Sequence, residues 1–303
     1  MNANSRWTPS WACSIAIASL TTTIGVCADA DNKVIHKFLF SINSKLENNV
    51  GGESVKMTAD SKLAYTLQHQ GNEVVLFCDS VAVKVTQDGK EQSEYQMSRD
   101  RFLAKDKGKT TIDVKEKEAN ERLREMLRDS FGSMLCKIQV DDDGREVNRT
   151  IVARPGAKSL VDNGSIDSMR FFHSVFFGDK ERWKSSRQVG VGNGALVKGD
   201  LSFEKVLSQK RENGKEASQV QVKVSGVLKN DGFKTPDAPV NLKSTALLRI
   251  KKEQVFDRKL KEWVSGELVG RLSMEFYEGD KKVGTGAGTM LIKLELRTDD
   301  ATP

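Results

Sequence analysis

Long runs of alternating apolar and polar residues dominate the second half of this sequence. One face of residues 262–277 carries Leu268, Leu272, Met274 and Phe276, and one face of residues 281–297 carries Met290, Ile292, Leu294 and Leu296. A period of two is that of a β-strand with one buried face. Strands this long, in antiparallel order, favour a strongly curved sheet or a two-sheet sandwich over a parallel α/β fold.

The same alternation predicts strands through most of the remaining chain. The expected ranges are 34–44, 62–69, 73–86, 91–98, 134–140, 145–153, 186–198, 201–211, 216–228, 243–250 and 253–257. Within 73–86 the apolar positions change side near Asp79 and Ser80, which predicts a β-bulge. The pair Asp88-Gly89 predicts a tight hairpin turn, with 91–98 returning as a polar edge strand.

Two segments have helical spacing instead. Between 113 and 131 the apolar residues are Ala119, Leu123, Met126, Leu127 and Phe131, a spacing that puts them on one helical face, with Gly132 ending the helix. A second helix is expected at 165–177. The predicted fold class is therefore α+β, predominantly antiparallel β, with a long curved sheet or sheets packed on one or two amphipathic helices.

Residues 1–30 resemble a cleavable secretory signal peptide. Arg6 is the only charge before Asp29, and a short apolar stretch between them ends in small residues at 26–30. An uncleaved anchor and lipid attachment at Cys27 are the alternatives, and cleavage with export to the periplasm or the exterior is favoured. The remaining chain divides at 31–184 and 185–303, or forms one continuous domain.

Charge and cysteine content narrow the function classes. The net charge of +6 is spread over interleaved Lys, Arg, Asp and Glu, whereas nucleic-acid proteins usually concentrate positive charge. After cleavage the cysteines are Cys78 and Cys136, which form one disulfide or remain as buried thiols. The sequence has no C-x-x-C spacing, the pattern that would indicate a zinc site or a redox-active cysteine pair.

No catalytic, metal or cofactor motif emerges from the residue pattern. His36, His69 and His173 are far apart in the sequence, and each is interpreted as a structural histidine. The glycine strings at 190–194 and 284–288 run into strands, so they predict a bulge, a bend or close packing against a helix instead of a nucleotide loop.

The segment 171–177 holds four phenylalanines, which is more than one buried helical face needs. The helix is then buried nearly all round, or one ring lines the wall of a groove for a lipid or apolar partner. Phe171 and Phe177, at the edges of the buried face, are the candidate wall residues.

Residues 131–147 (Phe-Gly-Ser-Met-Leu-Cys-Lys-Ile-Gln-Val-Asp-Asp-Asp-Gly-Arg-Glu-Val) follow the first predicted helix, and a second pattern runs from Val255 to Phe276. Together they resemble a family of uncharacterised exported bacterial proteins of planctomycete type, a domain of unknown function. The expected layout is also similar to the envelope lipoprotein carriers, whose sheet wraps a helix around an apolar cavity.

Two functions follow as hypotheses. The first is a non-catalytic envelope or surface protein that binds a lipid, an apolar partner or another envelope protein in the hollow of its sheet. The second is a hydrolytic enzyme whose site is assembled from scattered residues such as His69, His173 and Asp141. A histidine beside a carboxylate would favour the enzyme, and an apolar lining without titratable groups would favour the binding protein.

Overall fold

A computed structural model describes residues 34–141, 146–154, 169, 172–173, 180–190, 196–206, 219–234, 242–257 and 262–297. Its strands are β1 (Val34–Val50), β2 (Glu53–Gln70), β3 (Glu73–Gln87), β4 (Lys90–Ser98), β5 (Arg101–Asp106), β6 (Lys109–Lys115), β7 (Met134–Val140), β8 (Glu146–Ile151), β9 (Arg182–Gly190), β10 (Leu196–Lys205), β11 (Gln219–Lys234), β12 (Leu242–Asp257), β13 (Glu262–Glu278) and β14 (Lys281–Arg297). The described helices are a 3-10 turn, η1 (Glu116–Glu118), and α2 (Glu121–Arg128).

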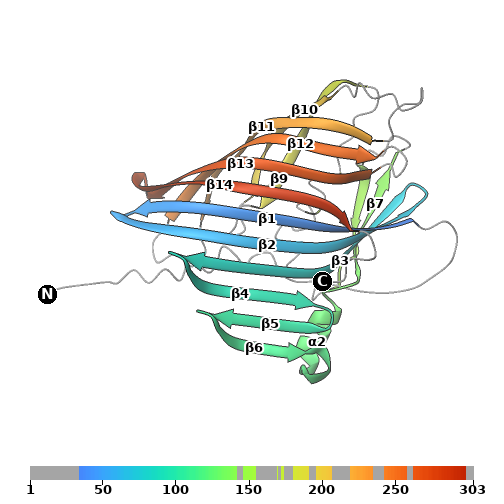
Figure 1. Cartoon of the computed structure of the whole chain (residues 1–303), viewed down its shortest axis with the longest axis horizontal. Helices are drawn as coiled ribbons and strands as arrows, with labels where there is room; N and C mark the ends of the chain where they lie inside the picture. Colours follow the sequence, from blue (N-terminus) through green and yellow to red (C-terminus); the bar gives the residue numbers. More distant parts are fainter. Residues whose placement is uncertain are drawn as a thin grey trace.

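The strands form one antiparallel sheet in the order β6-β5-β4-β3-β2-β1-β14-β13-β12-β11-β10-β9, with β7 and β8 attached to β3 (Figure 1). The first and last described strands, β1 and β14, are neighbours at its centre and pair from Lys37–Arg297 to Val50–Gly284. Five strands on each side of this pair, β2 to β6 and β13 to β9, follow chain order as meanders. The sheet therefore joins strands of both predicted halves, 31–184 and 185–303, whose division into domains stays a prediction.

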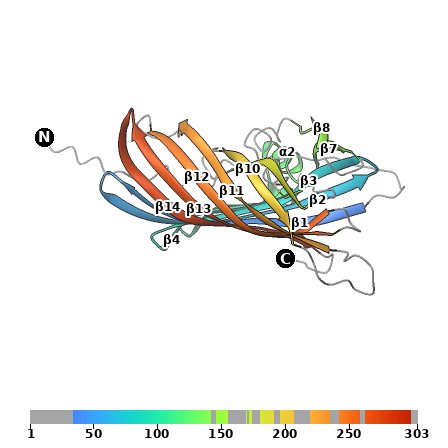
Figure 2. The ribbon, with the colours of Figure 1, turned by 90° about the horizontal axis from the view of Figure 1, so that it is seen from above.

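One face of the sheet is buried, and this face, called the inner face below, explains the alternation in the sequence. Along β1 the even-numbered residues His36, Phe38, Phe40, Leu46 and Asn48 are buried. On β13 and β14 the buried face again carries the even-numbered residues, including Leu268 and Met290. Figure 2 shows the sheet from above as a curved layer, with β7, β8 and α2 on one side of β1 and β2. The prediction of a curved, mainly antiparallel sheet is confirmed.

The resemblance to envelope lipoprotein carriers and the packing of the sheet on two helices are not supported. The described residues contain one α-helix, α2, and it lies at the end of the sheet near β6 (Figure 1). At eight residues, about 12 Å, it is too short to cross a sheet whose central strands are 17 and 18 residues long. The second predicted helix, 165–177, lies outside the described residues except for Met169, Phe172 and His173.

Helix α2 is also shorter than the predicted range 113–131. Its first turn is capped by the Asn120 side chain, whose Oδ1 accepts a hydrogen bond from the Leu123 amide at 2.9 Å. Residues 113–115 instead belong to β6, and Gly132 follows with a φ of +81°, which suits glycine. The predicted apolar face is confirmed, since Leu127 and Phe131 are fully buried while Leu123 and Met126 pack against the core.

The predicted bulge is present at Asp79. Tyr65 of β2 faces Cys78 whereas Ala64 faces Ser80, so Asp79 is the extra residue of β3. The sheet forks there, because β7 pairs with β3 before the bulge and β4 pairs with β3 after it. The bulge thus lets one strand serve two neighbours.

Several strand boundaries differ from the prediction. The Asp88-Gly89 turn is confirmed by positive φ angles at both residues, but β4 pairs with β3 and β5 and is not an edge strand. Strands β5 and β6, joined at Lys107-Gly108, had no predicted counterpart. Residues 186–198 fall on two strands, β9 and β10, while 243–250 and 253–257 are one strand, β12.

Residues 1–30, the predicted signal peptide, lie outside the described residues. In the part of the chain that the structure describes, no helix has the length and apolar character needed to cross a bilayer.

Candidate functional site

The centre of the inner face holds a cluster of aromatic rings contributed by β1, β2 and the connection between β8 and β9. Phe38 stacks on Tyr65, with ring centroids 5.5 Å apart. The His173 ring meets Phe38 edge-on at 4.5 Å, and its Nε2 lies 2.5 Å from the Tyr65 hydroxyl. Because Phe38 and Tyr65 are register partners on adjacent strands, the hairpin alone brings these two rings together.

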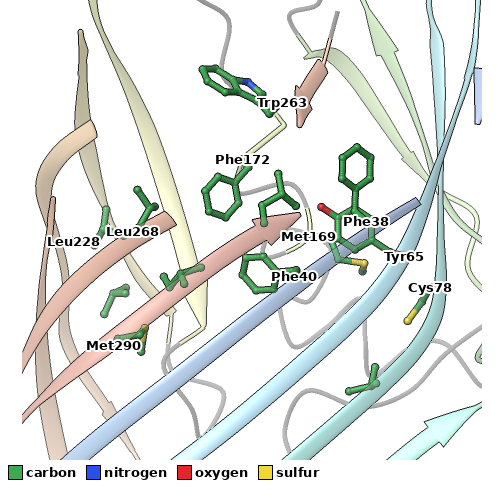
Figure 3. Close-up of a cluster of buried hydrophobic side chains, with 14 of the residues drawn as sticks. Phe38, Phe40, Tyr65, Cys78, Met169, Phe172, Leu228, Trp263, Leu268 and Met290 are labelled. Carbon is green, nitrogen blue, oxygen red and sulfur yellow. The ribbon is translucent and has the colours of Figure 1, made fainter. Parts of the chain in front are cut away.

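Phe172 covers the neighbouring part of the inner face (Figure 3). Its ring meets Phe40 edge-on at 6.0 Å and lies directly over Gly266 of β13. A Cβ at position 266 would collide with this ring, so glycine is what allows Phe172 to reach the sheet. Met169, Phe172 and His173 are all buried, which shows that this face accepts an aromatic or thioether side chain from outside the sheet.

The three histidines come closer than their sequence spacing suggests. His36 and His69 have ring centroids 5.3 Å apart, and His36 lies 6.3 Å from Phe38, the ring that also contacts His173. The β1–β2 register produces this, since His36 faces Leu67 and His69 is one diagonal step away on the same face. The three histidines, far apart in the sequence, thus lie on one face of the sheet, and the interpretation of each as a structural residue stays a prediction. Even so, the described residues contain no group of three or more His, Cys, Asp or Glu suited to a metal ion.

The other predicted site residues are less informative. Asp141 follows the end of β7, whose pairing with β3 ends at Gln139 and Glu73. Phe171 and Phe177, the candidate wall residues, lie outside the described residues. The site residues found instead are Phe172 and Gly266. Phe172 belongs to the phenylalanine-rich segment 171–177 but is not one of the candidate wall residues, and Gly266 was not singled out by the sequence, although a glycine on the buried face of a long strand is a signal that points to a close contact.

The two cysteines are buried in adjacent strands, β3 and β7. Cys136 of β7 faces Leu76 of β3, so Cys78 is a diagonal neighbour of Cys136. No disulfide joins these two described residues. Diagonal neighbours are usually further apart than the Cβ–Cβ separation of a disulfide. Burial, with a smaller contribution from the charge of Asp79, raises the pKa of the Cys78 thiol. A thiol held protonated in this way is a poor nucleophile.

A row of three glycines on β14, called the glycine stripe below, occupies the inner face beside β1. It comprises Gly284, Gly286 and Gly288, the predicted packing glycines. Of the three expected roles, a bulge, a bend or close packing against a helix, the structure shows close packing, but against a strand: a Cβ at 284 or 288 would collide with backbone oxygens of β1, and one at 286 would collide with Asn48 Oδ1. The stripe therefore permits very close packing of β14 on β1.

The inner face carries no buried carboxylate, ammonium or guanidinium group. Among the described residues, no Asp, Glu, Lys or Arg is buried, and the buried polar side chains include the imidazoles of His36 and His173 and the neutral groups of Ser44, Asn48 and Gln254. A half-buried charge occurs on the opposite face at the bulge, where Asp79 accepts a 2.7 Å hydrogen bond from Thr66. Burial raises the pKa of Asp79, and the Thr66 bond, Lys37 and Arg297 oppose that rise.

No family model matches this chain, and no curated protein matches it with significant similarity. The resemblance of residues 131–147 and 255–276 to exported bacterial proteins therefore stays a prediction.

Proposed function

We propose that this protein is an exported, non-catalytic binding protein whose inner face receives a lipid or another apolar molecule. The observation that carries the proposal is the docking of Phe172 and His173. These side chains come from a connecting segment, yet they are held by ring contacts with Phe40, Phe38 and Tyr65. A ligand with an apolar body can make the same kind of contact, because burial of apolar surface is not directional.

The charge distribution supports the same class of ligand. A charged group moved to a face that has no buried ion among its described residues would lose its hydration without a partner. An apolar or neutral ligand has no such penalty. Export rests on the signal-like segment 1–30, and it is consistent with a carrier or surface-binding role in the envelope.

The experiment uses the position of Trp263, which is fully buried near Phe172 on the inner side of the sheet (Figure 3). The full chain has four tryptophans, so Trp7→Phe, Trp11→Phe and Trp183→Phe together leave Trp263 as the only one. A brominated long-chain alcohol quenches tryptophan only at contact range. We expect saturable quenching of Trp263 at stoichiometric ligand.

The matched control keeps Trp183 and replaces Trp263 by Phe. Trp183 stacks on Phe203 at the edge strand β9, away from the Phe172 contact, and its quenching should be weaker. Absence of saturable quenching in both proteins would overturn the proposal, and equal quenching would move the site away from the inner-face centre.

A hydrolytic enzyme is the second candidate, favoured by the contact of His173 Nε2 with the Tyr65 hydroxyl and by the His36–His69 ring pair on the same face. Hydrolysis of a short-chain nitrophenyl ester by the full chain, abolished in His173→Gln and retained in an exposed-residue variant such as Arg122→Gln, would support it. Equal rates in the two variants would assign any hydrolysis to a background reaction.

A further inference from the structure

Asn48 lies beside the glycine stripe, and packing does not explain why a polar side chain is buried there. It lies on the inner face of β1, faces Gly286 of β14 and is 2% exposed. Neither its amide nitrogen nor its amide oxygen has a hydrogen-bond partner. Its surroundings are apolar, with Leu46 on the same strand, Met57 on β2 and Met274 on β13, all of them buried.

A buried amide without partners destabilises a folded protein, and a leucine of similar size would avoid that loss. The glycine at position 286 nevertheless leaves space for the amide, because the Cβ of any other residue there would collide with Asn48 Oδ1. An unpaired polar group that is kept at the expense of stability calls for an explanation, and a functional site is one. At Asn48 a donor and an acceptor lie side by side, without partners, among apolar side chains.

The side chains around Asn48 are also unusually adaptable. Met57 and Met274 lie on the strands on either side of β1 and β14, and the Met274 methyl group would be 3.0 Å from a Cβ at position 286. Methionine has three rotatable bonds and a polarisable sulfur, and it recurs on surfaces that accept varied apolar ligands. The methionines can repack around a head group without strain on the backbone.

We propose that Asn48, over the glycine stripe, binds the head group of a neutral amphiphile: a primary amide or an alcohol at the end of an acyl or alkyl chain. This rests on the proposed apolar-binding function and adds its chemical class. Both atoms of the Asn48 amide are satisfied only by a group that donates and accepts. An ionised carboxylate does not fit, because it can only accept hydrogen bonds. The charged residues of β1 nearest to Asn48, Lys45 and Glu47, are exposed on the opposite face and do not balance its charge.

The test measures the binding of decanamide, decanol and decanoate to the full chain directly, by isothermal titration calorimetry, because Trp263 lies eleven residues along β13 from Met274, the residue level with Asn48 and Gly286. At neutral pH the acid is ionised. We expect the amide and the alcohol to bind about tenfold more tightly than decanoate, the equivalent of about one buried hydrogen bond. Asn48→Leu should remove this preference while raising the midpoint of thermal unfolding.

The outcomes separate this inference from the function it rests on. If Trp263 is quenched by the brominated alcohol but decanamide, decanol and decanoate bind equally to the wild type, or if Asn48→Leu keeps the preference, the head-group site is wrong and apolar binding stands. If none of the three compounds binds and Trp263 is not quenched, both fail. Val55→Leu, a nearby change on β2 at the register position opposite Asn48, is the control and should keep the wild-type preference.

Discussion

At the scale of single residues, glycines on the inner face differ in what their missing Cβ would contact. At Gly288 that atom would strike the backbone oxygen of Lys45, whereas at Gly286 the three atoms nearest to it belong to the side chains of Asn48 and Met274. Side chains can rotate away, but a paired strand cannot. Identical substitutions two residues apart on one strand should therefore have unequal effects.

We predict that Gly288→Ala lowers the free energy of unfolding by about 2–3 kcal/mol or more, and Gly286→Ala by about 1 kcal/mol or less. Urea denaturation of the two variants and the wild type measures both values. Equal losses would show that β1 and β14 are not packed as closely as described.

Asp79 makes stability depend on pH in a direction opposite to that of most carboxylates. Burial raises its folded-state pKa, so the folded protein binds more protons than the unfolded chain between the ordinary aspartate pKa and the raised value. Stability contributed by Asp79 is thus present at low pH and is lost as the pH rises through that window.

The variant Asp79→Asn should be more stable than the wild type at neutral pH, and this advantage should disappear below the pKa of an unfolded aspartate. An asparagine oxygen can still accept the Thr66 hydrogen bond, so the comparison isolates the charge. Denaturation curves across the acidic range provide the test, and a constant difference between the two proteins at every pH would contradict it.

At the scale of elements, α2 shows what its apolar face and its polar face each contribute. Leu127 is fully buried, while Arg124 has 37% of its side chain exposed and bonds the main-chain oxygens of Glu116, Lys117 and Ala119. Arg124 thus holds η1 onto α2 and is not an inert surface residue. Arg122, which is exposed, is the better reference position.

Replacement of Leu127 by Ala should lower the free energy of unfolding by about 2–5 kcal/mol, because it leaves a cavity in the core. Arg122→Ala should change it by less than about 0.5 kcal/mol. Chemical denaturation compares them, and similar effects at both positions would refute the assigned face of the helix.

Most strands were predictable because the buried face imposes a period of two, and the Asp79 bulge was predictable because that period changes side. The misses have local causes. Strands β5 and β6 meet at Lys107-Gly108, where a lysine adopts a positive φ of 48°, and β6 is exposed along almost its whole length. An edge strand without a buried face gives little hydrophobic alternation to detect.

At the scale of the whole molecule, the pairing of β1 with β14 decides the architecture, and no local pattern predicts it. The two strands are separated by nearly the full described chain, so their register emerges only from the tertiary structure. One meander starts at this central pair and the other ends there, so the two ends of the described chain meet in the middle of the sheet.

The site was less predictable than the fold for the same reason. The histidine contacts require the β1–β2 register, and the Asn48–Gly286 contact requires the β1–β14 register. The sequence indicated an apolar binding surface through its excess of phenylalanine, while Asn48 looks like any polar residue near a turn. Its burial is a property of the assembled sheet.

Native mass spectrometry of the protein purified gently from its own host tests the central claim, that the inner face binds a neutral amphiphile, most directly. The account predicts a folded species whose excess mass corresponds to a small neutral amide or alcohol with an apolar chain, released on unfolding and absent from Asn48→Leu. A folded wild-type protein that has only its own mass, and that takes up no brominated alcohol when it is supplied, would contradict the account.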